Sequence, residues 1–408
     1  MKHRTANPLW TKIAIAVKYD TAPTMRHTAS NPPMASPAFA SPSQRLTDIA
    51  RARQLILLDH ATLPVGWISP WIERSWRRCM DQGLQAHEPV TFDVVSQQQM
   101  RRTAEGNQRL VQSAKPILNA LGRAIINTRY FAILTNAAGV VVDVSGPIDY
   151  ADPRAHSITR IGTDLSEHSV GTTAIGVALT ELQPVWLHRG EHFFAGTSMY
   201  SCAGAPLFGP DGACVGMLDL TGIDVVERPE LKHLVTQSAQ KVENALILAQ
   251  AHHLMVRLNW PGYAMGSEAD GLVCLDADGW ITGANQIARQ MLPKLATPGQ
   301  PPVHAGEVFG IPFEMLFDAA RRHDARLEIP LWTGLRLQAL PTERTSEGLP
   351  VEAGLRTSTR DHLPLRDIET ALIREAVDQA RGNVAQAALA LGISRATVYR
   401  KLGHKKPH

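Results

Sequence analysis

The basic residues at the carboxyl end of this 408-residue sequence are the first group that could do chemistry. Five lysines and arginines and no acidic residue lie between Ile393 and His408, whereas the whole chain has 41 basic and 38 acidic residues. A local positive charge of this kind suits contact with phosphate groups. The polar and basic side chains that we predict to make such contacts are Ser394, Arg395, Thr397, Tyr399, Arg400, Lys401 and Lys405.

The spacing of small and apolar residues around this segment predicts two short helices joined by a turn. Ala388 is small enough for two helices to approach, Gly392 allows the positive φ of a turn, and Val398 supplies a core side chain. Asn383 and Ser394 can cap the two helices. In such a unit the second helix enters the major groove of duplex DNA, and flanking cations hold phosphates. The alternative is a solvated helical hairpin whose charges have no partner.

A second group of candidate residues lies between residues 162 and 222. Pockets for small molecules are mostly apolar and carry a few polar anchors, and the side chains of this stretch fit that description. The residues that we predict to line a pocket are Thr173, Glu191, His192, Phe193, Phe194, Tyr200, Cys202 and Asp219. We expect Thr173 at the start of a helix and Asp219 at the end of a strand. The alternative for Glu191 and His192 is that they satisfy backbone groups of a loop.

Disulfide, metal and membrane chemistry find little support. The chain has four cysteines without a C-x-x-C pair, which excludes a disulfide scaffold or zinc ribbon and fits a reducing, cytoplasmic location. Cys202 and Cys214 are interpreted as small core residues. The histidines at positions 156, 168, 188 and 192 are scattered over predicted loops, so we expect neither a metal nor a cofactor. No run of about 18 apolar residues exists that could span a membrane.

Hairpins and helices must position these residues. Alternating apolar residues around two turn sequences predict β-hairpins over residues 131–144 and 203–220. Helical periodicity predicts long helices over residues 96–126 and 230–258. A further hairpin is expected over residues 271–283. It is followed by a helix from Asn285, a helix over residues 313–322, and strands over residues 326–329 and 335–340.

The carboxyl segment resembles the DNA-binding domain of the factor-for-inversion-stimulation (Fis) family. The resemblance covers residues 363–403 and rests on the strings Gly382-Asn-Val-Ala-Gln-Ala-Ala388 and Leu391-Gly-Ile-Ser-Arg-Ala-Thr-Val-Tyr-Arg-Lys-Leu402. It implies that an amphipathic helix over residues 365–380 pairs two subunits. Two recognition helices would then lie about one DNA turn apart, ~34 Å.

The candidate pocket region resembles the GAF domain of acetoin-catabolism-type activators, which are counted among sigma-54-dependent enhancer-binding proteins. The resemblance rests on Gly162–Leu179, Gly190-Glu-His-Phe193, Ser201-Cys-Ala-Gly-Ala-Pro206, Gly216-Met-Leu-Asp-Leu-Thr-Gly222, and Ser75-Trp-Arg-Arg-Cys79. It covers most of residues 68–248 and, more weakly, a PAS-like stretch over residues 268–340. Enhancer-binding activators also carry an ATPase with the phosphate loop G-x-x-x-x-G-K-[ST]. This sequence contains no such string.

The expected fold class is therefore α+β with several domains. A disordered arm is expected over residues 1–44, because its Pro, Ser and Thr cannot bury enough apolar surface. The domains that follow are a helical region over 45–129, a GAF sensor domain of antiparallel sheet and helices over 130–258, a PAS-like α+β domain over 259–340, a linker over 341–362, and an all-α Fis-type helix-turn-helix over 363–408.

These resemblances imply a transcriptional regulator that is not an enzyme. A small metabolite would bind the GAF domain and change how a homodimer binds DNA. Because the phosphate loop is missing from the sequence, we expect this to happen without ATPase activity. The implied partners are double-stranded DNA, a small-molecule effector, a second copy of the chain, and RNA polymerase or a sigma-54 activator, with no membrane. One alternative is a non-ATPase partner that modulates a complete sigma-54 activator. Another is a methionine-sulfoxide reductase that uses Cys202 and Cys214.

Overall fold

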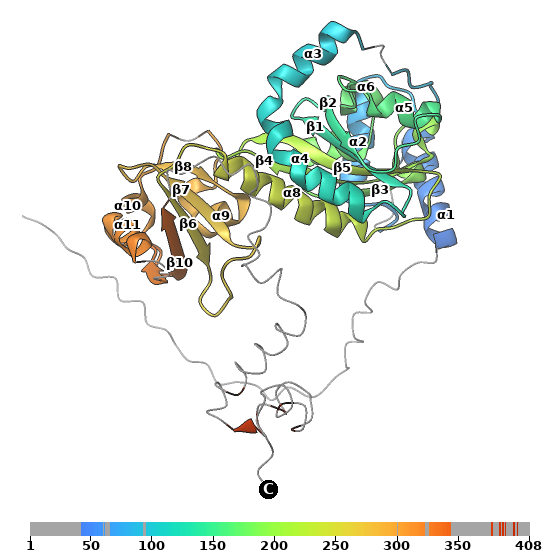
Figure 1. Ribbon diagram of the computed structural model, residues 1–408. Coiled ribbons are helices and arrows are strands. Elements are labelled where there is room, and N and C mark those ends of the chain that lie inside the picture. The colour runs from blue at the N-terminus through green and yellow to red at the C-terminus, as the bar shows by residue number, and fades with distance from the viewer. Residues whose placement is uncertain are drawn as a thin grey trace, which may run out of the picture. The chain divides into compact units, whose positions relative to one another are not determined.

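A computed structural model describes residues 42–59, 61, 66–92, 95–299, 301–322 and 326–343, together with Val377, Asn383, Val384, Gln386, Ala388, Arg395 and Val398. Two five-stranded sheets with helices packed on them make up most of the described part of the chain (Figure 1). All strand pairs in both sheets are antiparallel. The α+β class expected from the sequence is confirmed. Within these residues, no helix is long and apolar enough to cross a membrane.

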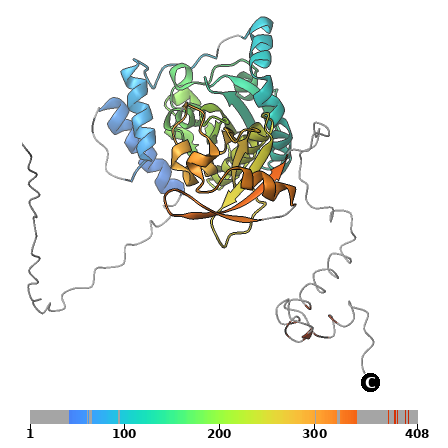
Figure 2. The same ribbon diagram turned by 90° about the vertical axis from the view of Figure 1, so that its left-hand side faces the viewer.

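Helices precede the first sheet. They are α1 (Pro42–Arg53), the π-helical turn η1 (Gln54–Leu58), α2 (Pro70–Asp81), α3 (Gln97–Gly106) and α4 (Gln108–Ala124). Residues 48–58 and α2 pack beside each other (Figure 2). The single helix expected over residues 96–126 is wrong, because the chain breaks at Asn107, where φ is −118°. The Asn107 amide donates to the carbonyl oxygen of Thr103 at 2.7 Å and ends α3.

The first sheet has the strand order β2-β1-β5-β4-β3. Its strands are β1 (Tyr130–Asn136), β2 (Val141–Ser145), β3 (Val185–His188), β4 (Tyr200–Phe208) and β5 (Cys214–Ile223). Both expected hairpins are present, β1–β2 and β4–β5. Their turns contain Gly139 and Gly212, whose φ values of +80° and +83° suit glycine.

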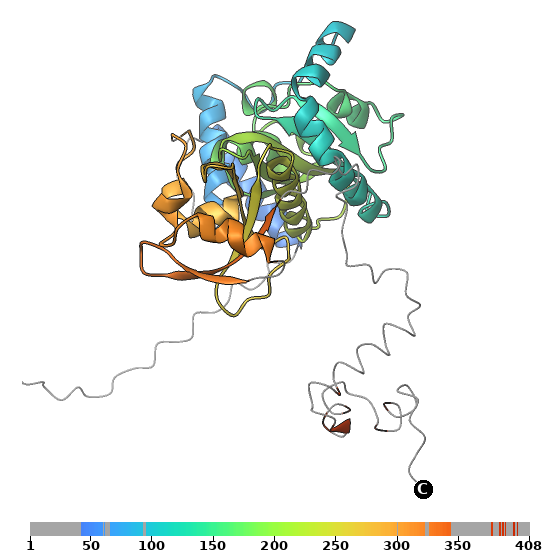
Figure 3. The ribbon, with the colours of Figure 1, turned by 60° about the vertical axis from the view of Figure 1, so that its left-hand side comes forward.

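Alternation along the strands gives the first sheet two different faces. Ala132 and Leu134 of β1 pack on one face of the sheet. Helices α4 and α8 (Leu231–Leu248) cover this face (Figure 3). Phe131 and Ile133 point to the opposite face. The short elements over that face are α5 (Pro153–Thr159), α6 (Glu167–Val170), α7 (Ala174–Glu181), η2 (Arg189–Glu191) and η3 (Ala195–Thr197). This second face bears the candidate site.

The helix expected over residues 230–258 is also wrong. Helix α8 ends at Leu248, and residues 254–259 form strand β6 (Leu254–Asn259). Leu254, Val256 and Leu258 are buried whereas Met255 and Arg257 are half-buried, which is the period-two pattern of a strand. The sequence between the two elements has no Gly or Pro to mark the change.

The second sheet has the order β8-β7-β6-β10-β9. The further strands are β7 (Gly271–Leu275), β8 (Ile281–Ala284), β9 (Leu327–Pro330) and β10 (Arg336–Glu343), and the helices are α9 (Gln286–Met291), η4 (Pro293–Leu295), α10 (Ala305–Val308) and α11 (Glu314–Arg321). Strand β6 lies at the centre of this sheet, between β7 and β10. Because β10 extends to Glu343, the linker expected from residue 341 cannot begin there.

The described positions near the carboxyl end fit the expected helical pair. Ala388 and Val398 are helical and buried together, and the apolar residues Val377 and Val384 pack against them. The Asn383 side chain accepts a hydrogen bond from the backbone N–H of Gln386 at 3.2 Å, so the predicted cap is present. Arg395 is helical and exposed. The helix expected over residues 365–380, apart from Val377, and the turn at Gly392 lie outside the described residues.

Candidate functional site

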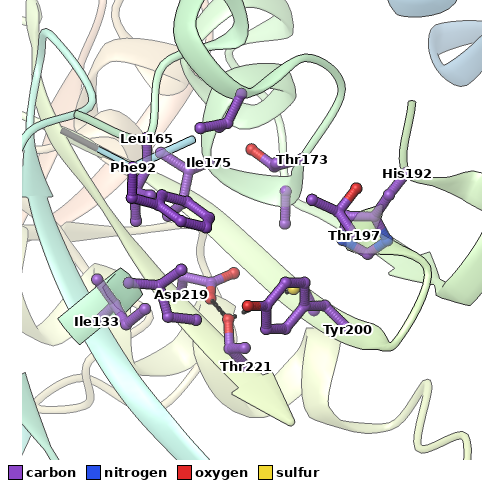
Figure 4. Close-up of a pocket in the computed structure, with 14 residues that line it drawn as sticks. Phe92, Ile133, Leu165, Thr173, Ile175, His192, Thr197, Tyr200, Asp219 and Thr221 are labelled. Atoms are coloured by element: carbon purple, nitrogen blue, oxygen red, sulfur yellow. Dashed lines mark hydrogen bonds between the residues drawn. The ribbon is translucent and has the colours of Figure 1, made fainter. Parts of the chain in front are cut away.

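A cavity lies between the second face of the first sheet and the segments that cover it (Figure 4). The space between its walls is about 390 Å³, including its open mouth. Strands β1, β4 and β5 form the floor, and α5 to α7 with the segment after β3 form the cover. The lining residues are Phe92, Ile133, Ile158, Leu165, Val170, Thr173, Ala174, Ile175, His192, Thr197, Tyr200, Cys202, Asp219 and Thr221.

Asp219 is the acidic residue of the cavity floor. It lies in the middle of β5, opposite Ile133 of β1 and Gly204 of β4, and not at a strand end as expected, because β5 continues in register to Ile223. Its side chain is fully buried. Its Oδ2 atom accepts a hydrogen bond from the Thr221 hydroxyl, while Oδ1 has no partner in the described part of the chain. Burial raises the pKa of this carboxyl to about 7.

His192 enters the cavity from the cover. Its ring is buried, and Nδ1 lies 2.9 Å from the carbonyl oxygen of Arg189. A carbonyl oxygen can only accept, so Nδ1 carries the proton. Nε2 has no hydrogen-bond partner among the described residues. Burial lowers the pKa of the ring to about 4, so His192 is neutral at physiological pH.

Three other predicted residues line the cavity with their polar groups engaged. The Thr173 hydroxyl caps α7 by accepting from the backbone N–H of Gly176 at 3.1 Å. The Tyr200 hydroxyl donates to the carbonyl oxygen of Arg154 at 3.2 Å, and burial raises its pKa. Cys202 lies 3.4 Å from the Thr221 hydroxyl, and burial raises the pKa of its thiol well above the usual value.

The remaining three predicted residues lie outside this cavity. Glu191 is buried, and its carboxylate accepts from the backbone N–H of His188 at 2.7 Å. Phe193 and Phe194 are buried against the N-terminal helices, in the cluster that contains Ile72 and Trp76. The sequence alternative, a loop that satisfies backbone groups and joins the core, therefore describes these three residues.

The segment that carries His192 is held by side chains from the N-terminal helices. The Arg53 guanidinium donates to the carbonyl oxygens of Gly190 at 2.9 Å, His192 at 2.5 Å and Phe193 at 2.8 Å. Trp76 donates from Nε1 to the carbonyl oxygen of Glu191 at 2.9 Å. The backbone carbonyl oxygens of four consecutive residues, 190 to 193, thus accept hydrogen bonds from two side chains. Arg53 also lies over the Trp76 ring, 5.6 Å from its centroid.

A second contact holds the cover at α6 and α7. Arg78 of α2 donates to both carboxylate oxygens of Glu167, at 2.7 and 2.9 Å, and to Glu181 at 2.9 Å. The Ser75 hydroxyl donates to Glu167 at 2.6 Å and lies 2.7 Å from the hydroxyl of Thr172. The Ser75-Trp-Arg-Arg-Cys79 string therefore fixes the cover from α2. Fully buried Ser75 and nearly buried Glu167 make this a desolvated polar network.

The candidate redox cysteines are far apart. Cys202 pairs with Thr221 in the β4–β5 hairpin, whereas Cys214 pairs with Phe208. Six residues of β4 separate these positions, which is roughly 20 Å along a strand. A disulfide requires Cα atoms within about 7 Å, so these two thiols cannot pair in this fold. Within the described residues, no three His, Cys, Asp or Glu side chains are grouped as a metal site.

Replacing Asp219 with asparagine is expected to remove a pH-dependent loss of stability. The folded-state pKa of about 7 lies above the unfolded value of about 3.9. The folded state therefore binds the proton of this carboxyl more tightly than the unfolded state does. This difference adds to the unfolding free energy in full below about pH 4, and the added free energy is lost as the pH rises to about 7. Between pH 5 and pH 8 the wild type should lose about 1–3 kcal/mol more unfolding free energy than Asp219→Asn.

Urea unfolding at the two pH values measures this difference. Glu243, whose pKa burial raises to about 8, contributes to both chains and cancels in the comparison. Asp278→Asn, at an exposed turn, is the matched control and should keep the wild-type pH dependence. Parallel pH profiles for wild type and Asp219→Asn would show that the carboxyl titrates normally.

The candidate DNA contacts are represented by one described residue. Arg395 lies on a helix, exposed, three residues before the buried Val398. This is the arrangement that a recognition helix needs, with the basic face outward and the apolar face inward. Ser394, Thr397, Tyr399, Arg400, Lys401 and Lys405 lie outside the described residues and remain predictions.

Several residues of the site were not predicted from the sequence. Ile133 and Thr221 could have been found, since one pairs with Asp219 and the other follows it two residues later on the same face of the sheet. Arg53 and Phe92 gave no signal, because they come from distant segments. The other residues that line the cavity and were not predicted are Ile158, Leu165, Val170, Ala174, Ile175 and Thr197.

Comparison with known proteins finds family matches over two parts of the chain. Residues 364–403 match the bacterial regulatory proteins of the Fis family, and residues 45–244 match the N-terminal domain of MimR. The acetoin catabolism regulatory protein of Cupriavidus necator is 31% identical over 254 residues, which are 61% of this chain and 37% of that protein. The acetoin dehydrogenase operon transcriptional activator AcoR of Bacillus subtilis is 28% identical over 180 residues, which are 43% of this chain and 29% of that protein.

A structural comparison finds the crystal structure of the E. coli DhaR(N)–DhaL complex, with a TM-score of 0.41, 15% identity, and coverage of 68% of this chain and 100% of that chain. The two acetoin regulators are longer proteins, and this chain matches only about a third of the length of each. The chain thus combines a stretch similar to the MimR N-terminal domain with a Fis-type helix-turn-helix segment, and it is similar to transcriptional regulators of acetoin catabolism.

Proposed function

We propose that this chain is a ligand-responsive, sequence-specific DNA-binding regulator. A small metabolite occupies the cavity of the N-terminal domain, and the Fis-type segment binds duplex DNA as a homodimer. The observation that carries the proposal is the combination, in one chain, of a Fis-type segment with a cavity whose wall holds two buried polar atoms without partners. A ligand can alter DNA binding only as far as it binds two states of the dimer unequally.

The cover of the cavity supports this coupling. Residues 188–193 contribute His192 to the cavity wall and their carbonyl oxygens to Arg53 and Trp76. A ligand that moves His192 therefore also changes contacts of the N-terminal helices. Since the cover is joined to two separate helices by hydrogen bonds, occupancy can bias their position.

The regulator acts without hydrolysing ATP. The sequence contains no G-x-x-x-x-G-K-[ST] string, whose backbone amides and lysine would hold the phosphates of ATP. An enzymatic role for the cysteines is disfavoured, because burial raises the pKa of the Cys202 thiol and Cys214 lies too far from it to act with it.

A second candidate function is modulation of a complete sigma-54 activator. It is favoured by one observation, namely that the stretch shared with the Cupriavidus necator regulator is only 37% of that protein. A chain that carries a sensor-like domain and a Fis-type segment could occupy the same DNA sites as a longer activator. Co-purification with such an activator, at a fixed ratio, would favour this candidate.

We expect Arg395→Ala to lower the preference of the full chain for its own DNA site by about 1–3 kcal/mol, or roughly 5- to 150-fold, the size of one good base contact. Gel retardation of fragments from its genomic neighbourhood, against random competitor, measures the preference. Gln386→Ala, exposed on the preceding helix, is the matched control and should stay within about threefold of wild type. A wild-type chain that never retards any fragment better than random DNA would overturn the proposed function.

A further inference from the structure

We propose that the cavity binds a short, uncharged aliphatic diol, with one hydroxyl group at Asp219 and the other at His192. This inference rests on the proposed sensor role of the cavity and adds the chemical class of the ligand. Two atoms carry it, Asp219 Oδ1 and His192 Nε2. Both belong to buried side chains that line the cavity, and neither has a hydrogen-bond partner in the described part of the chain.

His192 brings to the cavity wall an acceptor that has no partner among the described residues. Its single proton is on Nδ1, where the carbonyl oxygen of Arg189 accepts it at 2.9 Å, so the Nε2 lone pair is free. The ring stays neutral, since burial holds its pKa near 4. A buried acceptor without a partner loses its hydrogen bonds to water and gains none in return. The ligand group that faces His192 must therefore be a donor.

Asp219 requires a hydroxyl in either of its protonation states. The Thr221 hydroxyl donates to Oδ2, which leaves Oδ1 to face the cavity (Figure 4). When ionised, Oδ1 is an acceptor and needs a donor. When protonated, the proton is on Oδ1 and needs an acceptor. A hydroxyl group both donates and accepts, so it satisfies Asp219 on both sides of its pKa of about 7.

The rest of the wall sets the charge and the body of the ligand. Among the described lining residues there is no Lys or Arg, so a carboxylate or phosphate would be buried beside Asp219 without a counter-charge. Side chains such as Phe92, Ile133 and Leu165 make most of the surface apolar. An ammonium group brings three donors to one place, whereas the two unpartnered atoms lie on different walls, one on β5 and one on the cover. Two hydroxyls on a short hydrocarbon match this arrangement.

The test is a matched ligand series with the full chain. Terminal diols of two to six carbons are compared with the mono-alcohol, the carboxylate and the primary amine of the same carbon number, by calorimetric titration. For at least one chain length we expect the diol to bind about tenfold more tightly than its mono-alcohol, the size of one satisfied buried hydrogen bond. Equal affinity of diol and mono-alcohol at every length overturns the inference, as does a carboxylate or an amine that binds more tightly than the diol.

Two variants locate the hydroxyl groups. In His192→Phe, which removes the acceptor and keeps an aromatic ring, the ratio of diol to mono-alcohol affinity should fall towards one. In Asp219→Leu, which removes both carboxyl oxygens and keeps a similar side-chain size, the same ratio should fall at least threefold. Because each ratio is taken on one protein, a general loss of stability affects both ligands alike. A ratio that stays at the wild-type value in both variants overturns the assignment.

The DNA measurement separates this inference from the proposed function. If the diol binds as expected but leaves gel retardation of the genomic fragment unchanged, the regulatory role fails and the ligand class stands. If retardation responds to another class of compound and no diol binds more tightly than its mono-alcohol, the ligand class fails and the regulatory role stands.

Discussion

Val398→Asp in the full chain is expected to reduce DNA binding to the level of random competitor, about a thousandfold or more below the specific affinity. Val398 is fully buried and packs with Ala388, Val377 and Val384. A carboxylate at this position would be buried without a partner, which costs several kcal/mol. A small helical unit has only a few kcal/mol of stability to lose. The two helices would separate, and the exposed face that carries Arg395 would lose its orientation.

Fluorescence anisotropy with the genomic fragment measures this loss. Val398→Ile, which keeps the apolar character with one added methylene, is the matched control and should bind within about fivefold of wild type. Because the cavity lies in another part of the chain, calorimetric binding of a cavity ligand should be unchanged in Val398→Asp. If Val398→Asp binds the fragment within threefold of wild type, the buried pair at positions 388 and 398 is not the core of the DNA-binding unit.

The hairpins of the first sheet could be predicted from the sequence because their signals are local. In β1–β2 and β4–β5, alternating apolar residues flank turns with Gly139 and Gly212. The boundary between α8 and β6 could not be predicted. The run from Leu254 to Leu258 is too short to distinguish a helix from a strand, and no Gly or Pro precedes it. Its pairing with β7 and β10 decides the structure.

The candidate site was predicted only in part, and the reason is physical. Tyr200, Cys202 and Asp219 alternate along neighbouring strands, so the sequence places them on one face of the sheet. Phe193 and Phe194 belong to a loop, where no periodicity tells a cavity from a core contact. Their packing on the N-terminal helices depends on residues more than a hundred positions away.

The contacts of the cover could not be predicted at all. Arg53 binds backbone carbonyl oxygens, which every residue has, so its partners leave no trace in the sequence. Arg78 has acidic partners, but Glu167 and Glu181 are among 38 acidic residues of the chain. Only the folded backbone selects them.

Arg53→Ala is expected to lower the unfolding free energy of the cavity-bearing domain by about 3 kcal/mol. The change removes the donors for the carbonyl oxygens of Gly190, His192 and Phe193. A buried acceptor left without a partner costs about 1–3 kcal/mol, and water that enters the half-buried site recovers part of this sum. Arg53→Lys should fall between wild type and alanine, because an ammonium cannot reproduce the planar fork that reaches three carbonyl groups.

Urea unfolding gives the stability, and hydrogen exchange of residues 188–197 gives the local effect, since the cover should open more readily when its donor is lost. Arg51→Ala is the matched control, because Arg51 is exposed on the same helix, and it should stay within about 0.5 kcal/mol of wild type. Faster exchange in this segment with little change elsewhere would show that Arg53 acts on the cover of the cavity. If Arg53→Ala is as stable as Arg51→Ala and exchanges at the wild-type rate, the N-terminal helices do not hold the cover, and the path from ligand to helix must lie elsewhere.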